Sequence, residues 1–320
     1  MSDRHVVIVG GGIIGVCCAY YLARRGARVT LLERGELGAA ASYGNAGSIA
    51  PGHLPINKPG RAWQAIKWMF DARSPLHLAR PYDPRLWRWL LEFHRKCTAE
   101  HLHHAMRLLG PLGHATQRQF DEIVAAERLD CDYRRAGYYE VFLTGQAMAG
   151  ARGEQPLLNQ LGYDVQTLSG AEMVEREPAF AANLAGATYH AEAATCNPHR
   201  FVLELARAAQ RRGATLCTRT PVLEVVVAGH RAAGVRTASG EIVNGDVVLL
   251  ATGAYSQELL GRLGHALPLQ PAKGYHRDSD PARDGAPNLG VACVLGEAFV
   301  FCTPMDRFVR FAGTLEFSGI

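Results

Sequence analysis

The stretch that decides the fold is residues 6–35, VVIVGGGIIGVCCAYYLARRGARVTLLERG, in which three consecutive glycines separate an apolar run from a helical one. Residues 5–9 are a short β-branched run suited to a buried parallel strand, and residues 13–25 have the apolar spacing of a helix. Residues 27–32 predict a second strand that ends at Glu33. The segment therefore predicts a strand, a helix and a strand, with a glycine turn at the first junction.

The glycines have the spacing of a dinucleotide-binding turn, Gly10-x-Gly12-x-x-Gly15. The first permits a tight turn, the second lets a pyrophosphate approach the backbone, and the third lets the helix pack closely on the strand. Free N–H groups and the helix dipole stabilise phosphate charge there. Glu33 lies where the ribose hydroxyls of adenosine are expected, and an acid at this position disfavours NADP. The motif predicts FAD or NAD without distinguishing them.

The next segment favours FAD. Residues 38–52, GAAASYGNAGSIAPG, form a small-residue loop too long for an ordinary strand-to-helix connection, which suits close wrapping around a large cofactor. With this loop and the preceding pattern, the chain resembles the D-amino acid dehydrogenase group within the D-amino acid oxidase family of FAD enzymes. Further matches are WQAIKWM at 63–69, VVLLATGAYS at 247–256 and PAKGY at 271–275.

The resemblance implies an α/β fold with a Rossmann-like FAD-binding domain, similar to glutathione reductase and built on a parallel sheet. This domain is interleaved with an α+β substrate domain on an antiparallel sheet. The expected boundaries are 1–58 and 190–274 for the FAD-binding domain, and 59–189 and 275–320 for the substrate domain. Family members continue further, with an arginine-containing substrate segment and a final glycine-rich turn, so the C-terminal part of the family fold is expected to be missing.

The cofactor residues follow from the resemblance together with the motif. They are Gly10, Gly12, Ile13, Ile14, Gly15, Glu33, Arg34, Ala41, Ser42, Asn45, Ala46, Gly47, Val222, Ala251, Thr252 and Gly253.

Periodicity places the remaining elements. Helices are expected within 61–130, at 157–161, at 170–176 and at 201–212, and strands at 137–144, 215–217, 222–227, 234–237 and 247–250. Residues from Tyr275 onward are expected to be strands. Segments 299–302 and 307–312 predict a hairpin that turns across 303–306.

The expected chemistry is oxidation of a D-amino acid, or of a cyclic imino acid resembling proline or hydroxyproline, by hydride transfer from Cα to flavin N5. The resulting imine hydrolyses to a 2-oxo acid or stays cyclic. His53, Lys273 and Tyr275 are the candidate substrate-pocket residues present. An arginine clamp for the substrate carboxylate is expected beyond residue 320. Alternatives are a glycine- or sarcosine-type amine oxidase that uses oxygen, an NAD-linked dehydrogenase, and a non-catalytic FAD-binding subunit.

Composition narrows the partners. The chain has 34 basic and 30 acidic residues, a net charge of +4, so charge alone indicates no nucleic-acid partner. Its eight cysteines show no CxxC pair, which is typical of reduced thiols in the cytoplasm, and no metal site is expected, not even at His101, His103 and His104. No membrane-spanning run and no export signal is expected.

Residues 61–120 hold ten Lys or Arg, four Asp or Glu and four tryptophans. The segment is either a solvated helical face or a surface for anionic lipid. The resemblance implies a quinone-linked electron acceptor and peripheral contact with the cytoplasmic face of the inner membrane. A homo- or hetero-oligomer stays open.

Overall fold

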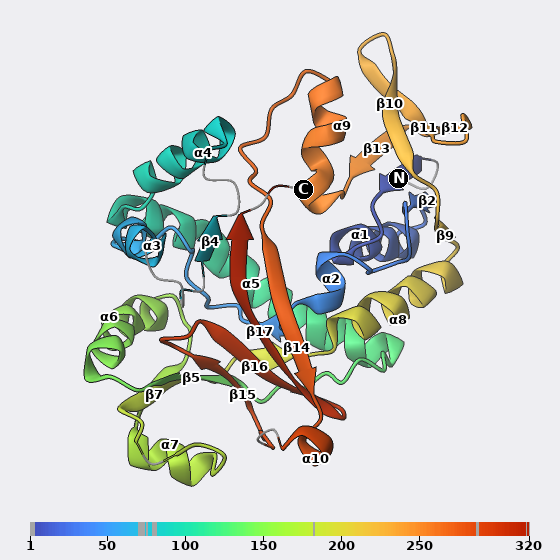
Figure 1. The fold of residues 1–320 in the computed structure, drawn as a ribbon. Coiled ribbons are helices and arrows are strands. Elements are labelled where there is room, and N and C mark those ends of the chain that lie inside the picture. The colour runs from blue at the N-terminus through green and yellow to red at the C-terminus, as the bar shows by residue number, and fades with distance from the viewer. Residues whose placement is uncertain are drawn as a thin grey trace.

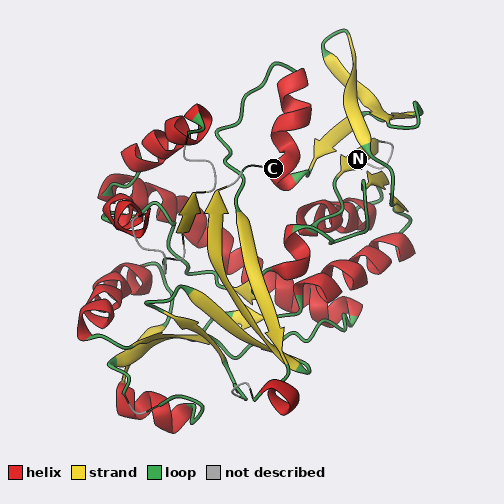
Figure 2. Cartoon of the chain, viewed as in Figure 1, coloured by secondary structure: helices red, strands yellow, loops and turns green. Residues whose placement is uncertain are grey.

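A computed structural model describes residues 4–69, 74, 76–78, 82–181, 183–285, 288–317 and 319 (Figures 1 and 2). The first layer is a parallel sheet with strand order β13-β1-β2-β9. Its strands are β1 (His5–Val9), β2 (Arg28–Leu32), β9 (Thr215–Cys217) and β13 (Val247–Leu250). Val6 pairs with Val29 on one side and with Val247 on the other. The four strands predicted for this sheet are confirmed.

Alternation along β1 explains how the parallel sheet is buried on both faces. Val6 and Ile8 pack with α1 (Ile13–Arg24) and α8 (Pro198–Arg211), which lie side by side in Figure 1. Val7 and Val9 face the opposite way, onto Val235 and Leu259. Successive side chains of a strand point to opposite faces, so both sets must be apolar.

The second face is covered by a small antiparallel sheet and a helix. The sheet consists of β10 (Val222–Ala228), β11 (Arg231–Thr237) and β12 (Ile242–Asn244), and the helix is α9 (Ser256–Arg262), which follows η1 (Gly253–Tyr255). The strands of this sheet are joined by turns at Gly229 and Gly240, each with a positive φ that favours glycine.

The second layer is a large sheet with strand order β14-β17-β16-β15-β5-β7-β6, and β4 pairs with β17. Its strands are β14 (Lys273–Ser279), β17 (Phe308–Phe317), β16 (Val300–Met305), β15 (Ala292–Leu295), β5 (Tyr138–Phe142), β7 (Gly186–His190), β6 (Val165–Ser169) and β4 (Leu76–Leu78). Its pairs are antiparallel except β15 with β5 and β17 with β4. The β15–β5 pair joins strands from the middle of the chain to strands near its end.

The remaining helices are α3 (Arg61–Met69), α4 (Pro84–Arg95), α5 (Ala99–Glu127), α6 (Gly145–Gln160), α7 (Gly170–Arg176) and α10 (Pro281–Asp284). Three local predictions are corrected. Helix α6 begins twelve residues before the expected 157, because Thr144 caps it by accepting the N–H of Ala147 and its small residues hide the apolar period. The C-terminal hairpin turns at residues 306–307, where Asp306 has a φ of 37°, and helix α10 interrupts the expected run of strands.

A two-stranded ribbon connects the layers. It pairs β3 (Ser48–Ile49) with β8 (Ala194–Thr195), just after the short helix α2 (Ala41–Gly44). Among the described residues, no helix has the length and apolar character needed to cross a bilayer.

Candidate cofactor and substrate site

The glycine turn leaves a stretch of backbone open to a ligand. Gly10 has a φ of +110°, and a Cβ there would lie 2.4 Å from the carbonyl oxygen of Ala251. A Cβ on Gly15 would lie 1.8 Å from the carbonyl oxygen of Gly10, so this glycine is required for helix–strand packing. At Gly12 the nearest described atom is Ser42 Oγ at 3.4 Å, an ordinary contact. The first and third glycines are thus required by close packing within the protein, whereas the second leaves the backbone open to the approach of a ligand.

Glu33 is fixed beside this turn by two backbone amides. Its Oε2 accepts a hydrogen bond from the N–H of Gly11 at 2.6 Å, and its Oε1 accepts one from Gly35 at 2.9 Å. A carboxylate has further lone pairs, which fit the hydroxyls of a ribose. The backbone of Glu33 also bonds to Cys217 and Thr220, so the chain that leads to Val222 at the start of β10 passes close by.

The segment 41–47 folds onto the start of α1. Ser42 is buried, and its Oγ accepts a hydrogen bond from the N–H of Ile13 at 3.0 Å. Asn45 holds the rest of the segment, since it accepts from the N–H of Gly47 at 2.8 Å and donates to the carbonyl of Ala41 at 2.9 Å. Ile14, in the first turn of α1, is 64% exposed.

The glycine turn, Glu33, segment 41–47 and residues 251–253 together form what we call the cofactor cradle. The last of these parts follows β13. The N–H of Ala251 donates to the carbonyl of Val9 at 2.8 Å, and Gly253 has a φ of +54° at the start of η1. The guanidinium of Arg34 lies over the ring of Tyr255, 3.7 Å from its centre. The segments with cofactor predictions therefore meet at the carboxyl ends of parallel strands, where open α/β sheets bind ligands.

These residues fit FAD: a helix start for the diphosphate, a fixed carboxylate for the ribose and a backbone-rich segment beyond it. Residues 5–320 match the model of the DAO family, described as FAD dependent oxidoreductase. The chain belongs to this family. FAD is accordingly its cofactor.

Comparison with individual proteins supports the same family assignment. It is 31% identical to a D-amino acid dehydrogenase of Methylobacterium nodulans over 98% of its own length and 76% of the relative's. It is 32% identical to the D-amino acid dehydrogenase of Bradyrhizobium diazoefficiens, over 98% and 75%. Among solved structures, glycine oxidase from Bacillus cereus superposes with a TM-score of 0.70 at 21% identity, covering 98% of this chain and 70% of that one. The structural likeness supports the fold.

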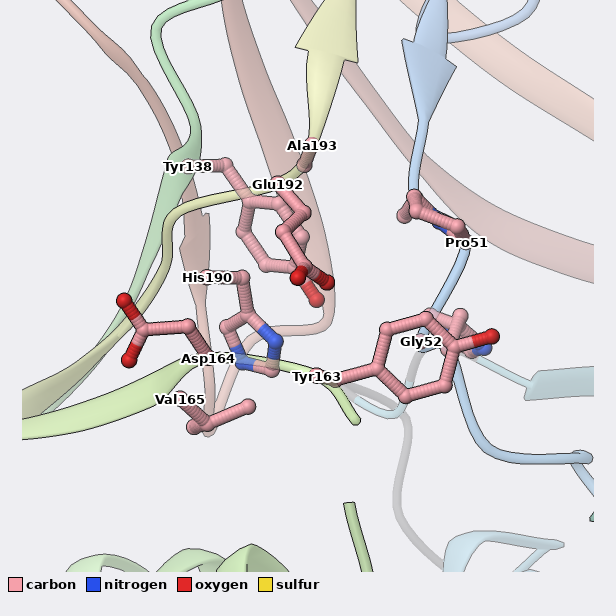
Figure 3. Close-up of a pocket in the computed structure, with 11 residues that line it drawn as sticks. Pro51, Gly52, Tyr138, Tyr163, Asp164, Val165, His190, Glu192 and Ala193 are labelled. Carbon is pink, nitrogen blue, oxygen red and sulfur yellow. The ribbon is translucent and has the colours of Figure 1, made fainter. Parts of the chain in front are cut away.

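The structure places His53 in a cavity of about 10 Å³ between the two-stranded ribbon and the large sheet (Figure 3). This is about the space of one water molecule. The cavity is lined by residues 50–53, Tyr138, Tyr163, Asp164, Val165, His190, Glu192 and Ala193.

Neutral rings and one buried carboxylate oxygen face this cavity. The ring of His190 stacks on Tyr138 with centres 4.4 Å apart. Burial lowers the pKa of His53, and burial together with nearby His53 lowers the pKa of His190 to about 4. Both imidazoles are therefore neutral at pH 7. Glu192 Oε2 is buried without a hydrogen-bond partner among the described residues.

Lys273 and Tyr275 lie on the edge strand β14. The hydroxyl of Tyr275 donates to Glu316 at 2.5 Å, which raises the pKa of the phenol, and Lys273 Nζ lies 3.8 Å from the same carboxylate. Strands β17, β16 and β15 separate β14 from β5, where Tyr138 lines the His53 cavity. Four strand spacings are roughly 19 Å. The structure thus brings Lys273 and Tyr275 together on β14, whereas His53 lines a cavity at β5, four strands away in the sheet order.

Sequence reasoning missed several residues of this region. His190 and Glu192 gave no motif, because they join the cavity only through the pairing of β7 with β5. Arg310 is buried on β17, where an arginine among the apolar residues FVRFAG was the available signal.

Proposed function

We propose that the chain is an FAD-dependent dehydrogenase that oxidises a D-amino acid, or a cyclic imino acid resembling proline. The observation that carries this proposal is its identity of about a third to D-amino acid dehydrogenases over 98% of its length. The fold supports it, because cofactor segment 41–47 lies against the large sheet. A Cβ on Gly44 would lie 2.5 Å from Nδ1 of His276 on β14.

When bound, FAD supplies a hydride acceptor for the substrate Cα. The chain holds this cofactor through the amides at the start of α1, through Glu33 and through segment 41–47. The large sheet provides the wall on which a substrate is oriented, and orientation of reacting atoms is a main source of rate enhancement. The substrate amine must be neutral, and the imine product is hydrolysed by water to a 2-oxo acid and ammonia, whereas a cyclic amine gives a cyclic imine.

The proposal includes an FAD-binding domain of residues 1–58 and 190–274 and a substrate domain of residues 59–189 and 275–320. It also includes His53, Lys273 and Tyr275 as candidates for residues that border the substrate. Tyr275 is half exposed on β14. Its hydroxyl is therefore accessible to a substrate carboxylate once its hydrogen bond to Glu316 is broken. His53 is neutral and therefore suits a pocket wall rather than a carboxylate clamp.

Anaerobic mixing of the FAD-loaded protein with a panel of D- and L-amino acids, glycine, sarcosine and D-proline tests the function. Bleaching of the flavin by D-amino acids or D-proline is the expected result. Bleaching by glycine or sarcosine alone, or by none of the panel, would contradict it. The same assay with Tyr275→Phe and His53→Gln shows which residue borders the substrate, since the bordering one raises KM.

The second part of the proposal is that the protein contacts the surface of an anionic membrane and passes its electrons there to a quinone-linked acceptor. It is supported by exposed apolar side chains on the basic helical segment, namely Trp63, Trp87, Leu91, Leu108, Leu109 and Leu112. Such a face inserts shallowly while arginines meet lipid phosphates. Co-sedimentation with vesicles of anionic lipid, but not of neutral lipid, is expected. Equal recovery in the supernatant with both vesicles would contradict membrane contact.

A further inference from the structure

Arg310, a buried arginine, joins two strands of the large sheet through an ion pair with Asp278, whose side chain is 35% exposed. Its Nε donates to Asp278 Oδ1 at 2.8 Å, and its Nη2 donates to Asp278 Oδ2 at 2.9 Å. The two residues are also register partners on β17 and β14. Arg310 is only 4% exposed. This two-point geometry fixes the plane of the guanidinium.

The third nitrogen of Arg310 points away from Asp278 toward the cofactor segment. Its Nη1 donates to the carbonyl of Tyr43 at 2.9 Å and to the carbonyl of Asn45 at 3.1 Å. The ring of Tyr43 also lies beside that of His276, with centres 6.1 Å apart. One side chain thus binds two parts of the protein at the same time. These are the large sheet, called the substrate sheet below because the proposed substrate is oriented on it, and the cofactor segment 41–47.

The bond to Asn45 has a consequence for the next amide. In a trans peptide the C=O and the following N–H point in opposite directions, and no described peptide bond is cis. A carbonyl of Asn45 directed at Arg310 therefore directs the N–H of Ala46 to the opposite side, away from the guanidinium. Ala46 is one of the residues that the family resemblance assigns to the cofactor.

A buried charge is a poor way merely to fill space between strands, since well-packed apolar residues do so at lower cost. Here the charge satisfies two carbonyls at the C-terminal end of α2, where carbonyls have no partner within the helix. We infer that Arg310 is a positioning residue, which sets the segment 43–46, and through it the flavin, at a fixed distance and angle from the substrate sheet. The part of this inference that concerns the substrate rests on the proposed function, and the part that concerns FAD does not.

Arg310→Lys tests the inference. Lysine keeps a positive charge within reach of Asp278, so the fold is expected to be retained. Its single nitrogen, however, cannot occupy at once the separate positions of Nε, Nη2 and Nη1, from which arginine reaches Asp278 on one side and the two carbonyls on the other. The Kd for FAD, measured by quenching of flavin fluorescence, is expected to rise about tenfold. The visible circular dichroism of the bound flavin is expected to change, and at saturating FAD kcat is expected to fall while KM stays the same.

Two further variants complete the experiment. Asp278→Asn leaves Arg310 in place but weakens its fixed plane, so it shifts Kd and dichroism in the same direction by less, and it replaces Arg310→Lys if that variant does not fold. Arg236→Lys is the matched control, because Arg236 bonds Glu224 across β10 and β11 at 2.7 Å, where the two side chains are 41% and 43% exposed. It is expected to behave as the wild type.

A folded Arg310→Lys or Asp278→Asn protein with the FAD affinity and dichroism of the wild type would overturn the inference. If no amino acid reduces the flavin of the wild type, the proposed function fails. The affinity and dichroism measurements still decide the role of Arg310.

Discussion

The cofactor cradle, made of residues 10–15, Glu33, segment 41–47 and residues 251–253, and the large sheet are built from different parts of the chain. In the cradle, backbone groups of residues 10–15 provide most of the groups proposed to contact the cofactor, and Glu33 is the main side chain. On the sheet, side chains far apart in sequence meet, such as Asp278 with Arg310 and Tyr138 with His190. A site made of backbone therefore needs a local pattern of small residues, whereas a site made of side chains needs only the strand pairing.

Gly15→Ala should break the cradle most severely. The added Cβ would lie 1.8 Å from a backbone oxygen, which has no flexible end that could move aside. Overpacking of this kind costs about 1–3 kcal/mol or more. We expect purified protein without FAD, measured as the ratio of flavin absorbance to protein.

The control for Gly15→Ala is Gly150→Ala on α6, where a Cβ would meet no described atom within 4 Å. That variant should keep its flavin and gain stability of roughly 0.5–1 kcal/mol from helix propensity. A Gly15→Ala protein with a full complement of FAD would refute the close-packing role of this glycine.

Glu33→Gln tests the carboxylate that is fixed beside the glycine turn. The amide keeps the shape but loses the charge that strengthens the bonds from Gly11 and Gly35 and from the ribose hydroxyls. The Kd for FAD should rise about tenfold in a fluorescence titration. Glu36→Gln, at an exposed position paired with Arg219, should leave Kd unchanged, and equal affinities for both variants would contradict the assignment of Glu33.

Protonation of His190 in the sheet cavity is expected to make the stability of the fold depend on pH. The pKa of His190 is about 4 in the folded chain and near 6.5 when unfolded, because burial disfavours its charged form. As pH falls below about 6.5 the unfolded state takes the proton first, so stability that is full above this pH is lost progressively down to about pH 4. The loss amounts to about 3 kcal/mol at most.

His190→Gln removes this contribution. Its free energy of unfolding, measured by denaturant titration at a series of pH values, should fall less between pH 6.5 and 4 than that of the wild type. His230→Gln, in the exposed turn after β10, serves as the control and should follow the wild type. Parallel curves for all three proteins would show that His190 does not couple protonation to folding.

The sequence predicted the cradle far better than the sheet site, for a physical reason. The strands, glycines and Glu33 of the dinucleotide turn are linked by contacts within about thirty residues, and their conformational demands limit the residue types. In the large sheet, the strand at 137–144 and the strands near the end of the chain were predicted. Strands β4, β6 and β7 were not, and α6 was predicted too short because glycine and alanine mask its period. Pairing between distant strands leaves no such mark, so the proximity of His190 to Tyr138 and of Arg310 to Tyr43 came only from the structure.

The pairing of Val6 with Val247 also bears on how the protein is made. At about 5–20 residues per second, a ribosome needs roughly 12–50 s to synthesise the stretch between them. Throughout that time one edge of β1 has no native neighbour, although β2 is already available on the other side. Until β13 is synthesised, this edge of β1 presents unpaired backbone N–H and C=O groups, so the nascent chain is open to pairing with strands of other chains.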